Sequence, residues 1–259
     1  MKITFIKSLL ATAAFVAAST ASAAVVTIPS DVIAGHGSHT LTFSADLLGA
    51  LDTGKVTISP DPSYVIQSAI ILDPEGNYAN ASITTPMTGV QFDNTSGQLV
   101  STSSTGGATL TAPALKSVST GGSMRVSDLS VDLLSQKVYA TITGANGVGT
   151  LNNVHLWNAA NITGHTAITG PGTFNTQISG LSITTTGFNT FVQALGLLSL
   201  GKGALATVTD FGTITSLINN TRLDGGPLLL ASSVPESSTY LYTLVGLAMM
   251  GMALRRKAN

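Results

Sequence analysis

Short apolar stretches alternate with turn residues along most of this chain, and several of them have the two-residue period of a β-strand. In Ser127–Leu133, apolar residues alternate with polar ones from Asp128 onward. We therefore expect Leu129, Val131 and Leu133 to face a core, with the polar residues between them outside. After a short turn, Lys137–Thr143 alternates again. This arrangement predicts a β-hairpin.

Further strands are predicted at Lys55–Ser59, Tyr64–Leu72 and Ser123–Leu133, with Asp-Pro, Gly-Gly and Asn-Gly turn signals recurring between such stretches. The pattern predicts an all-β domain over residues 24–233, built as an antiparallel β-sandwich. The Ser/Thr/Gly-rich segment Thr102–Gly107 is a long hairpin loop or a linker. A subdivision near residues 102–115 therefore stays open, although one continuous sandwich is favoured.

One or two short helices are expected inside this domain. Thr186–Leu198 carries apolar residues at helical spacing, and Gly201 follows as a residue that helps to end a helix. A second short helix is predicted at Asp46–Leu51, where the leucines have the same spacing.

The composition changes the picture by excluding several functions. Charged residues make up 9% of the 259 residues, and there is no cysteine. The segment from Asp31 to Glu236 holds all 12 acidic residues and six of the 11 basic ones, a net charge of −6. This balance argues against nucleic acid as a partner, because nucleic acid is bound through clustered cations. The absence of cysteine excludes disulfides, thiolate metal sites and a cysteine nucleophile.

The N-terminal segment has the three parts of a secretory signal peptide. Lys2 and Lys7 precede an apolar run, and Ala21 and Ala23 provide a small-x-small cleavage site. We expect residues 1–23 to be removed by signal peptidase after passage through the Sec translocon, so that the mature chain starts near Ala24.

The C-terminal segment, residues 234–259, also has three parts. A short motif, Val234, Pro235 and Glu236, precedes an uncharged apolar stretch at about residues 239–254, and a basic cluster follows it. The stretch is long enough to cover most of a bilayer as a transmembrane helix, and cations beside such a helix face the cytoplasm. The basic cluster consists of Arg255, Arg256 and Lys257.

These C-terminal residues resemble the PEP-CTERM sorting signal of Gram-negative bacteria. The resemblance implies that an exosortase, a membrane protease, reads the motif and removes the tail, so that the protein is released or transferred to the outside. The usual motif has a second proline after the glutamate, and Ser237 stands there in this chain.

The body of the chain is similar to uncharacterised exported PEP-CTERM proteins. The similarity rests on Gly121–Leu133, on His155-Leu156-Trp157 and on Gly180–Thr184. The body is also distantly similar to surface domains of the HtaA haem-uptake type, and no haem-binding residue is transferred from that similarity.

The histidines are the main candidates for site chemistry. His36 and His39 lie three residues apart, but the spacing matches no strong metal motif, so we expect a solvated loop and no metal site. His155 and Trp157 should point to the same face of a strand. They form either a ligand-binding face or a partly buried structural pair, and the structural pair is favoured. Asp73–Asn77 is interpreted as a turn rather than a calcium loop.

The sequence predicts an exported surface or extracellular-matrix protein with a structural or interaction role linked to exopolysaccharide or biofilm. We expect an inner-membrane-anchored precursor and then a location at the cell surface or outside the cell. We expect no enzyme activity and no cofactor. The alternative is a ligand-binding surface module for carbohydrate, haem or metal.

Overall fold

The computed structural model describes residues 25–28, 37–93, 95–169 and 172–220. These residues form antiparallel strands and three short helices, so the predicted all-β antiparallel class is confirmed, with one helix more than expected. The strands are β1 Val25–Ile28, β2 Gly37–Phe43, β3 Thr57–Pro60, β4 Gln67–Leu72, β5 Tyr78–Asp93, β6 Leu99–Ser104, β7 Gly107–Leu115, β8 Ser119–Asp132, β9 Lys137–Gly144, β10 Gly149–Asn158, β11 Asn161–Gly164, β12 Gly172–Ser179, β13 Ser182–Ile183 and β14 Gly212–Asn220. The helices are α2 Ala45–Thr53, α3 Thr185–Ala194 and α4 Ser199–Ala206.

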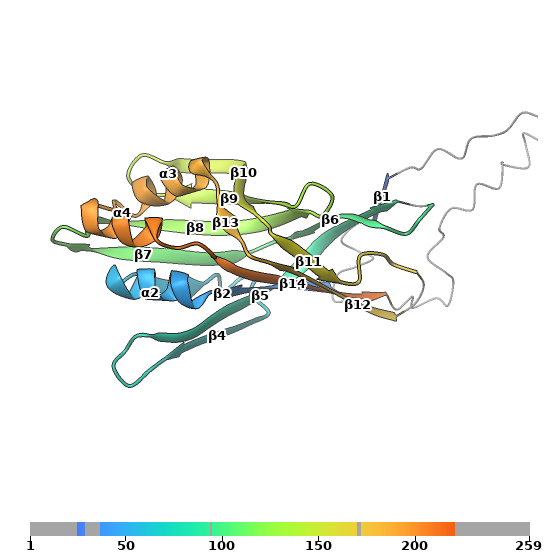
Figure 1. The fold of residues 1–259 in the computed structure, drawn as a ribbon, viewed down its shortest axis with the longest axis horizontal. Coiled ribbons are helices and arrows are strands. Elements are labelled where there is room, and N and C mark those ends of the chain that lie inside the picture. Colours follow the sequence, from blue (N-terminus) through green and yellow to red (C-terminus); the bar gives the residue numbers. More distant parts are fainter. Residues whose placement is uncertain (1–24, 29–36, 94, 170–171, 221–259) are drawn as a thin grey trace, which may run out of the picture.

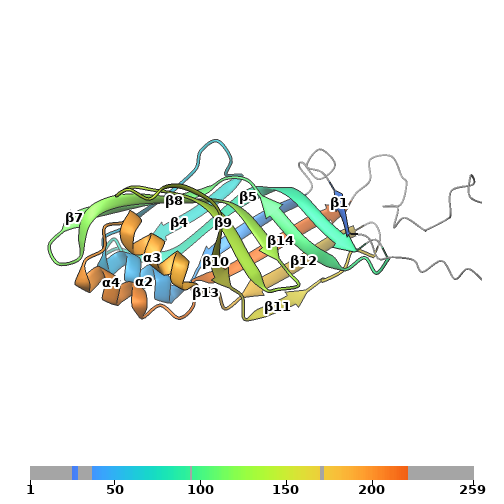
Figure 2. The same cartoon turned by 90° about the horizontal axis from the view of Figure 1, so that it is seen from above.

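The strands form one continuous network that folds into two facing layers (Figures 1 and 2). The central path runs β11-β12-β14-β2-β5-β6-β8-β9-β10-β13. The long strand β5 joins the layers, because its first part pairs with β2 and β4 and its second part with β6 and β1. The three helices gather at one end of the molecule, at the left of both figures.

The β8–β9 hairpin forms as the alternation predicts. Leu129, Val131 and Leu133 are buried, and the two strands pair in antiparallel register. The register shifts between Ser127 and Ser130, where Asp128 has a positive φ of 53°. A β-bulge of this kind lets the strand bend over the core without losing its inward-facing residues.

Helix α2 confirms the helix predicted at Asp46–Leu51. Ser44 caps it by accepting a hydrogen bond from the Leu47 N–H at 3.1 Å. Leu47, Leu48 and Leu51 are buried, so this face of α2 packs on the core beside β5.

The helix predicted over Thr186–Leu198 is confirmed as α3, but α3 ends earlier than predicted, at Ala194. Helix α4 begins at Ser199, beyond the predicted range, and was not predicted. Gly196 has a φ of +61°, a left-handed conformation that ends α3 and that other residues rarely adopt. A Cβ there would also lie 2.4 Å from the Thr120 hydroxyl. Gly201, expected to end the predicted helix, lies inside α4.

The segment Thr102–Gly107 is neither a long loop nor a linker. Its first residues belong to β6 and its last to β7, which leaves only Thr105 and Gly106 between the strands. Both β6 and β7 pair with β8. The same strand therefore runs past residues 102–107, and these residues do not separate two sheets.

The strands predicted at Lys55–Ser59 and Tyr64–Leu72 correspond to β3 and β4. Strand β3 is displaced toward the C-terminus and ends at Pro60, and β4 begins only at Gln67. Asp73 accepts a hydrogen bond from the Asn77 N–H at 2.7 Å, so the segment between β4 and β5 is the expected turn.

Candidate functional site

The candidate site is a small cavity of about 30 Å³ between the two layers. Leu41 of β2 lines one side and Leu129 of β8 the other, while Leu47 of α2 and Phe191 of α3 also line it. Pockets that take drug-sized molecules measure roughly 300–1,000 Å³, and an engineered cavity of roughly 150 Å³ binds benzene. The cavity is therefore large enough for about two water molecules and too small for a sugar ring or a haem.

Trp157 brings one of the few polar groups to this cavity. The side chain is buried, lines the cavity and lies against Phe211 with ring centroids 6.4 Å apart. Its indole N–H has no hydrogen-bond partner among the described residues. Buried indole N–H groups normally have a partner, so this N–H is suited to an acceptor the size of a water oxygen.

The expectation that His155 and Trp157 share one face is wrong. Strand β10 has a register shift between these residues, which places His155 opposite Tyr139 and Trp157 opposite Val138. Tyr139 and Val138 are neighbours in β9 and point to opposite faces of the sheet. Leu156 is the extra residue in β10, and the two-residue spacing therefore does not hold there. His155 instead lies beside Tyr139, with ring centroids 5.2 Å apart.

A row of buried polar residues crosses four strands of the layer that contains β2. Thr176 of β12 lies opposite Ser216 of β14, Ser216 opposite His39 of β2, and His39 opposite Thr85 of β5. All four residues are buried, and Thr85 also lines the cavity. Directly opposite residues on neighbouring strands share a face, so the row points into the core. An apolar row lies on each side of it, one of them running through Ile178, Ile214, Leu41 and Ile83.

His39 is the centre of this row. Its side chain is completely buried, and Nε2 lies 3.0 Å from the hydroxyl of Thr102 on β6. Burial lowers the pKa of His39 from 6.5 to about 4, because the charged imidazolium is poorly solvated in the core. The ring is therefore neutral at neutral pH.

Three polar atoms near this row have no hydrogen-bond partner among the described residues: Nδ1 of His39, Oγ of Ser216 and Oγ of Ser104. Each such atom costs about 1–3 kcal/mol when it is buried without a partner. Water is the chemical species that fits a small, uncharged site of this kind, because a buried water bonds to two to four polar groups.

The expectation that His36 and His39 lie in a solvated loop is wrong for His39, which is the fully buried residue of β2. His36 lies outside the described residues. The signal that identifies His39 is the alternation of His39, Leu41 and Phe43, which places all three on one face. Within the described residues, no group of three His, Cys, Asp or Glu side chains is placed to hold a metal ion.

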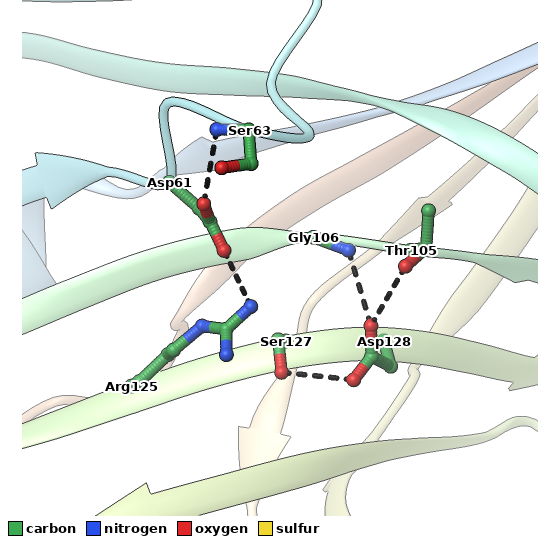
Figure 3. A network of polar contacts seen from close by, with 7 residues as sticks. All are labelled: Asp61, Ser63, Thr105, Gly106, Arg125, Ser127 and Asp128. Atoms are coloured by element: carbon green, nitrogen blue, oxygen red, sulfur yellow. Dashed lines mark hydrogen bonds and ion pairs between the residues drawn. The ribbon is translucent and has the colours of Figure 1, made fainter.

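Two glycines at the cavity wall, Gly106 and Gly107, are held by a polar network that sequence reasoning missed. Figure 3 shows the part of this network around Gly106. Asp128 accepts hydrogen bonds from the Gly106 N–H and the Thr105 hydroxyl, both at 3.1 Å. Asp61 forms an ion pair with Arg125, and its N–H donates to the Gly107 carbonyl at 3.0 Å. The network joins segments more than 60 residues apart in sequence, which no local pattern indicates. It fixes the β6–β7 connection.

Glycine is required in this connection because the chain passes very close to its neighbours. A Cβ at Gly107 would lie 2.0 Å from the Val126 carbonyl oxygen, and one at Gly106 would lie 2.4 Å from Cβ of Tyr64. Gly106 also has a φ of +88°. The network and the two glycines are therefore explained by packing, without a ligand.

The remaining site residues predicted from the sequence lie outside the described residues. These are the cleavage-site residues Ala21 and Ala23, the sorting motif Val234, Pro235 and Glu236, and the basic cluster Arg255, Arg256 and Lys257. The transmembrane helix predicted at about residues 239–254 also lies outside them. Among residues 25–28, 37–93, 95–169 and 172–220, no helix has the length and apolarity needed to cross a membrane.

Comparisons of the chain with models of protein families, with curated proteins and with solved structures found no match.

Proposed function

We propose that this chain is an exported PEP-CTERM protein whose β-sandwich domain has a structural or interaction role at the cell surface or in the extracellular matrix. The observation that carries the proposal is the C-terminal pattern of Val234-Pro235-Glu236, an apolar stretch and Arg255-Arg256-Lys257. In this proposal signal peptidase cuts after Ala23, a helix at about residues 239–254 holds the precursor in the inner membrane, and an exosortase then removes the tail.

The size of the cavity argues against a carbohydrate or haem site between the two layers of the domain. A cavity of about 30 Å³ does not admit a carbohydrate or a haem. The low-charge surface is consistent with contacts to neutral polymers such as exopolysaccharide, because many outward-facing strand positions are threonine, serine or asparagine.

Mass spectrometry of the exported protein tests the sorting step. We expect the wild-type product to lack Arg255-Arg256-Lys257, and a variant with alanine at Val234, Pro235 and Glu236 to keep this cluster and stay with the membrane. The matched variant Ser237→Pro completes the usual motif and should be processed at least as fully as the wild type. Wild-type exported protein with an intact basic end would contradict the proposal.

Deletion of the encoding gene tests the role after export. We expect altered matrix composition or cell aggregation, restored by the intact gene but not by the triple-alanine variant. If matrix and aggregation were both unchanged, the structural role would be wrong even if the tail were processed.

Trp157 provides a direct test of the ligand-binding alternative, because it is the chain's one tryptophan and lines the cavity. We expect its emission to be unchanged when neutral sugars or haem are added to the purified protein. A saturable change in emission would favour the alternative.

A further inference from the structure

Strand β4 is an unprotected edge of the sheet. Within the described part of the chain it pairs with β5 alone. The segment from Ile66 to Leu72 contains neither a charged residue nor a proline. Ile66, Ile71 and Leu72 are 61%, 53% and 53% exposed. A free edge strand with exposed apolar side chains is a template for pairing with another strand.

The other edge strands in the described residues lack this property. Strands β1, β3 and β11 have four residues each and β13 has two, whereas β4 has six. Strand β3 also ends at Pro60, which cannot donate a hydrogen bond to a neighbouring strand. The unpaired part of β10 is interrupted by two register shifts, and α3 packs against this strand. Short length, proline and bulges protect edges against pairing. Strand β4 has one register shift, between Ile71 and Leu72 at its end, so Gln67–Ile71 is an uninterrupted edge.

The distribution of charge around β4 indicates which strand fits beside it. Asp73 and Glu75 lie in the turn at the C-terminal end of β4, while Tyr64 and Ile66 lie at the other end without charge. Two copies of β4 in parallel would bring the acidic turns together. Two copies in antiparallel orientation place each acidic turn beside the uncharged end of the other strand, so like charges stay apart.

We propose that β4 pairs with β4 of a second copy of this chain, in antiparallel orientation about a two-fold axis. The pairing continues the sheet from one molecule into the other through main-chain hydrogen bonds, and it covers Ile66, Ile71 and Leu72. A two-fold interface uses the same surface on both molecules, so it closes at the dimer and leaves no free β4 for a third chain. The proposal is independent of export and of tail processing.

Cross-linking of the full chain tests the proposal, because the chain has no cysteine of its own. Ser68→Cys places one thiol on β4, and a short bifunctional maleimide can then join only two copies. We expect most of the protein to be recovered as a covalent dimer. The control Leu200→Cys places a thiol on α4, at a side chain that is 59% exposed, and should yield at least about tenfold less dimer.

A second variant separates strand pairing from other association. Ile71→Lys adds a charge to the edge at an exposed side chain, so the fold is kept, and the emission of Trp157 verifies this. Together with Ser68→Cys it should lower the yield of dimer about tenfold. All variants carry the same termini, so association through the termini cannot produce these differences. Absence of dimer with Ser68→Cys, equal yields at Ser68 and Leu200, or no effect of Ile71→Lys would overturn the proposal.

Discussion

Strands β2 and β9 have the same sequence pattern but different interiors. In β9, the buried residues Val138, Ala140 and Ile142 alternate with residues that are less buried. In β2, the corresponding inward positions are His39, Leu41 and Phe43, so a polar ring occupies a place that β9 gives to an apolar side chain. Alternation therefore defines which side chains enter the core, and their chemistry decides how stable that core is.

Burying the inward residues stabilises the fold on β9, whereas burying His39 on β2 destabilises it unless the ring is hydrogen-bonded. An apolar residue in β9 gains stability from burial without needing a partner. His39 needs a hydrogen-bond partner for each ring nitrogen, and Thr102 provides one of the two within the described residues. The first prediction removes the apolar contribution of β9, and the next two alter the polar one of β2.

The largest effect is expected for Ile142→Ala in β9. Ile142 is completely buried, and shortening such a side chain leaves a cavity that costs about 4 kcal/mol of unfolding free energy. Urea unfolding followed by the emission of Trp157 measures this loss. Thr141→Ala, on the same strand but facing outward, is the control and should change stability by less than about 0.5 kcal/mol. A loss below about 1 kcal/mol for Ile142→Ala would show that β9 is not part of the tightly packed core.

The same contrast explains how much of the structure the sequence predicts. Alternation identified the β8–β9 hairpin and the inward positions of Leu129, Val131 and Leu133, and leucine spacing identified α2. These elements are defined by local periodicity, which is a property of the sequence.

The sequence predictions fail where one residue interrupts the spacing of apolar residues, or where the hydrogen-bond partner of a residue is distant in sequence. Leu156 shifts β10 by one residue, so His155 and Trp157 point to opposite faces. Gly196 ends α3 before the predicted end at Leu198. The hydrogen bond between His39 and Thr102 joins residues 63 positions apart, so local spacing does not reveal it.

A smaller effect is expected from titration of His39. Above about pH 6.5 the ring is neutral in both the folded and the unfolded chain. As pH falls from about 6.5 to about 4, the unfolded chain binds a proton that the folded chain does not, so the free energy of unfolding decreases. The full decrease is about 3 kcal/mol. Urea unfolding at a series of pH values measures it.

His39→Gln is the matched control for this titration, because glutamine keeps a polar side chain but does not titrate in this range. The pH dependence between about 6.5 and 4 should be absent in this variant. Carboxylates act in a separate window: the hydrogen bond from the Asn77 N–H lowers the pKa of Asp73 below its usual 3.8. Stability from that group is present above 3.8 and decreases only as pH falls further. An unchanged pH dependence in His39→Gln would mean that another group titrates in place of His39.

The smallest effects compare two hydroxyl groups of similar burial. Thr102→Val keeps the shape of the side chain but removes the hydroxyl bonded to Nε2 of His39, which leaves a buried nitrogen without a partner. We expect a loss of about 2 kcal/mol of unfolding free energy, measured in urea at neutral pH. His39 is neutral above about pH 6.5 in both the folded and the unfolded chain. The loss of stability in Thr102→Val should therefore persist above that pH.

Ser216→Ala is the control for Thr102→Val, and it removes a hydroxyl that has no partner among the described residues. Because no protein hydrogen bond is lost and a buried hydroxyl without a partner is removed, we expect no loss of stability and a gain of about 1 kcal/mol. Equal losses in the two variants would mean that the Ser216 hydroxyl binds a water, and that this hydrogen bond stabilises the fold as much as the one between Thr102 and His39. In that case the polar row that includes His39 of β2 would hold a bound water that stabilises the core. The inward positions of β9, by contrast, are filled by apolar side chains.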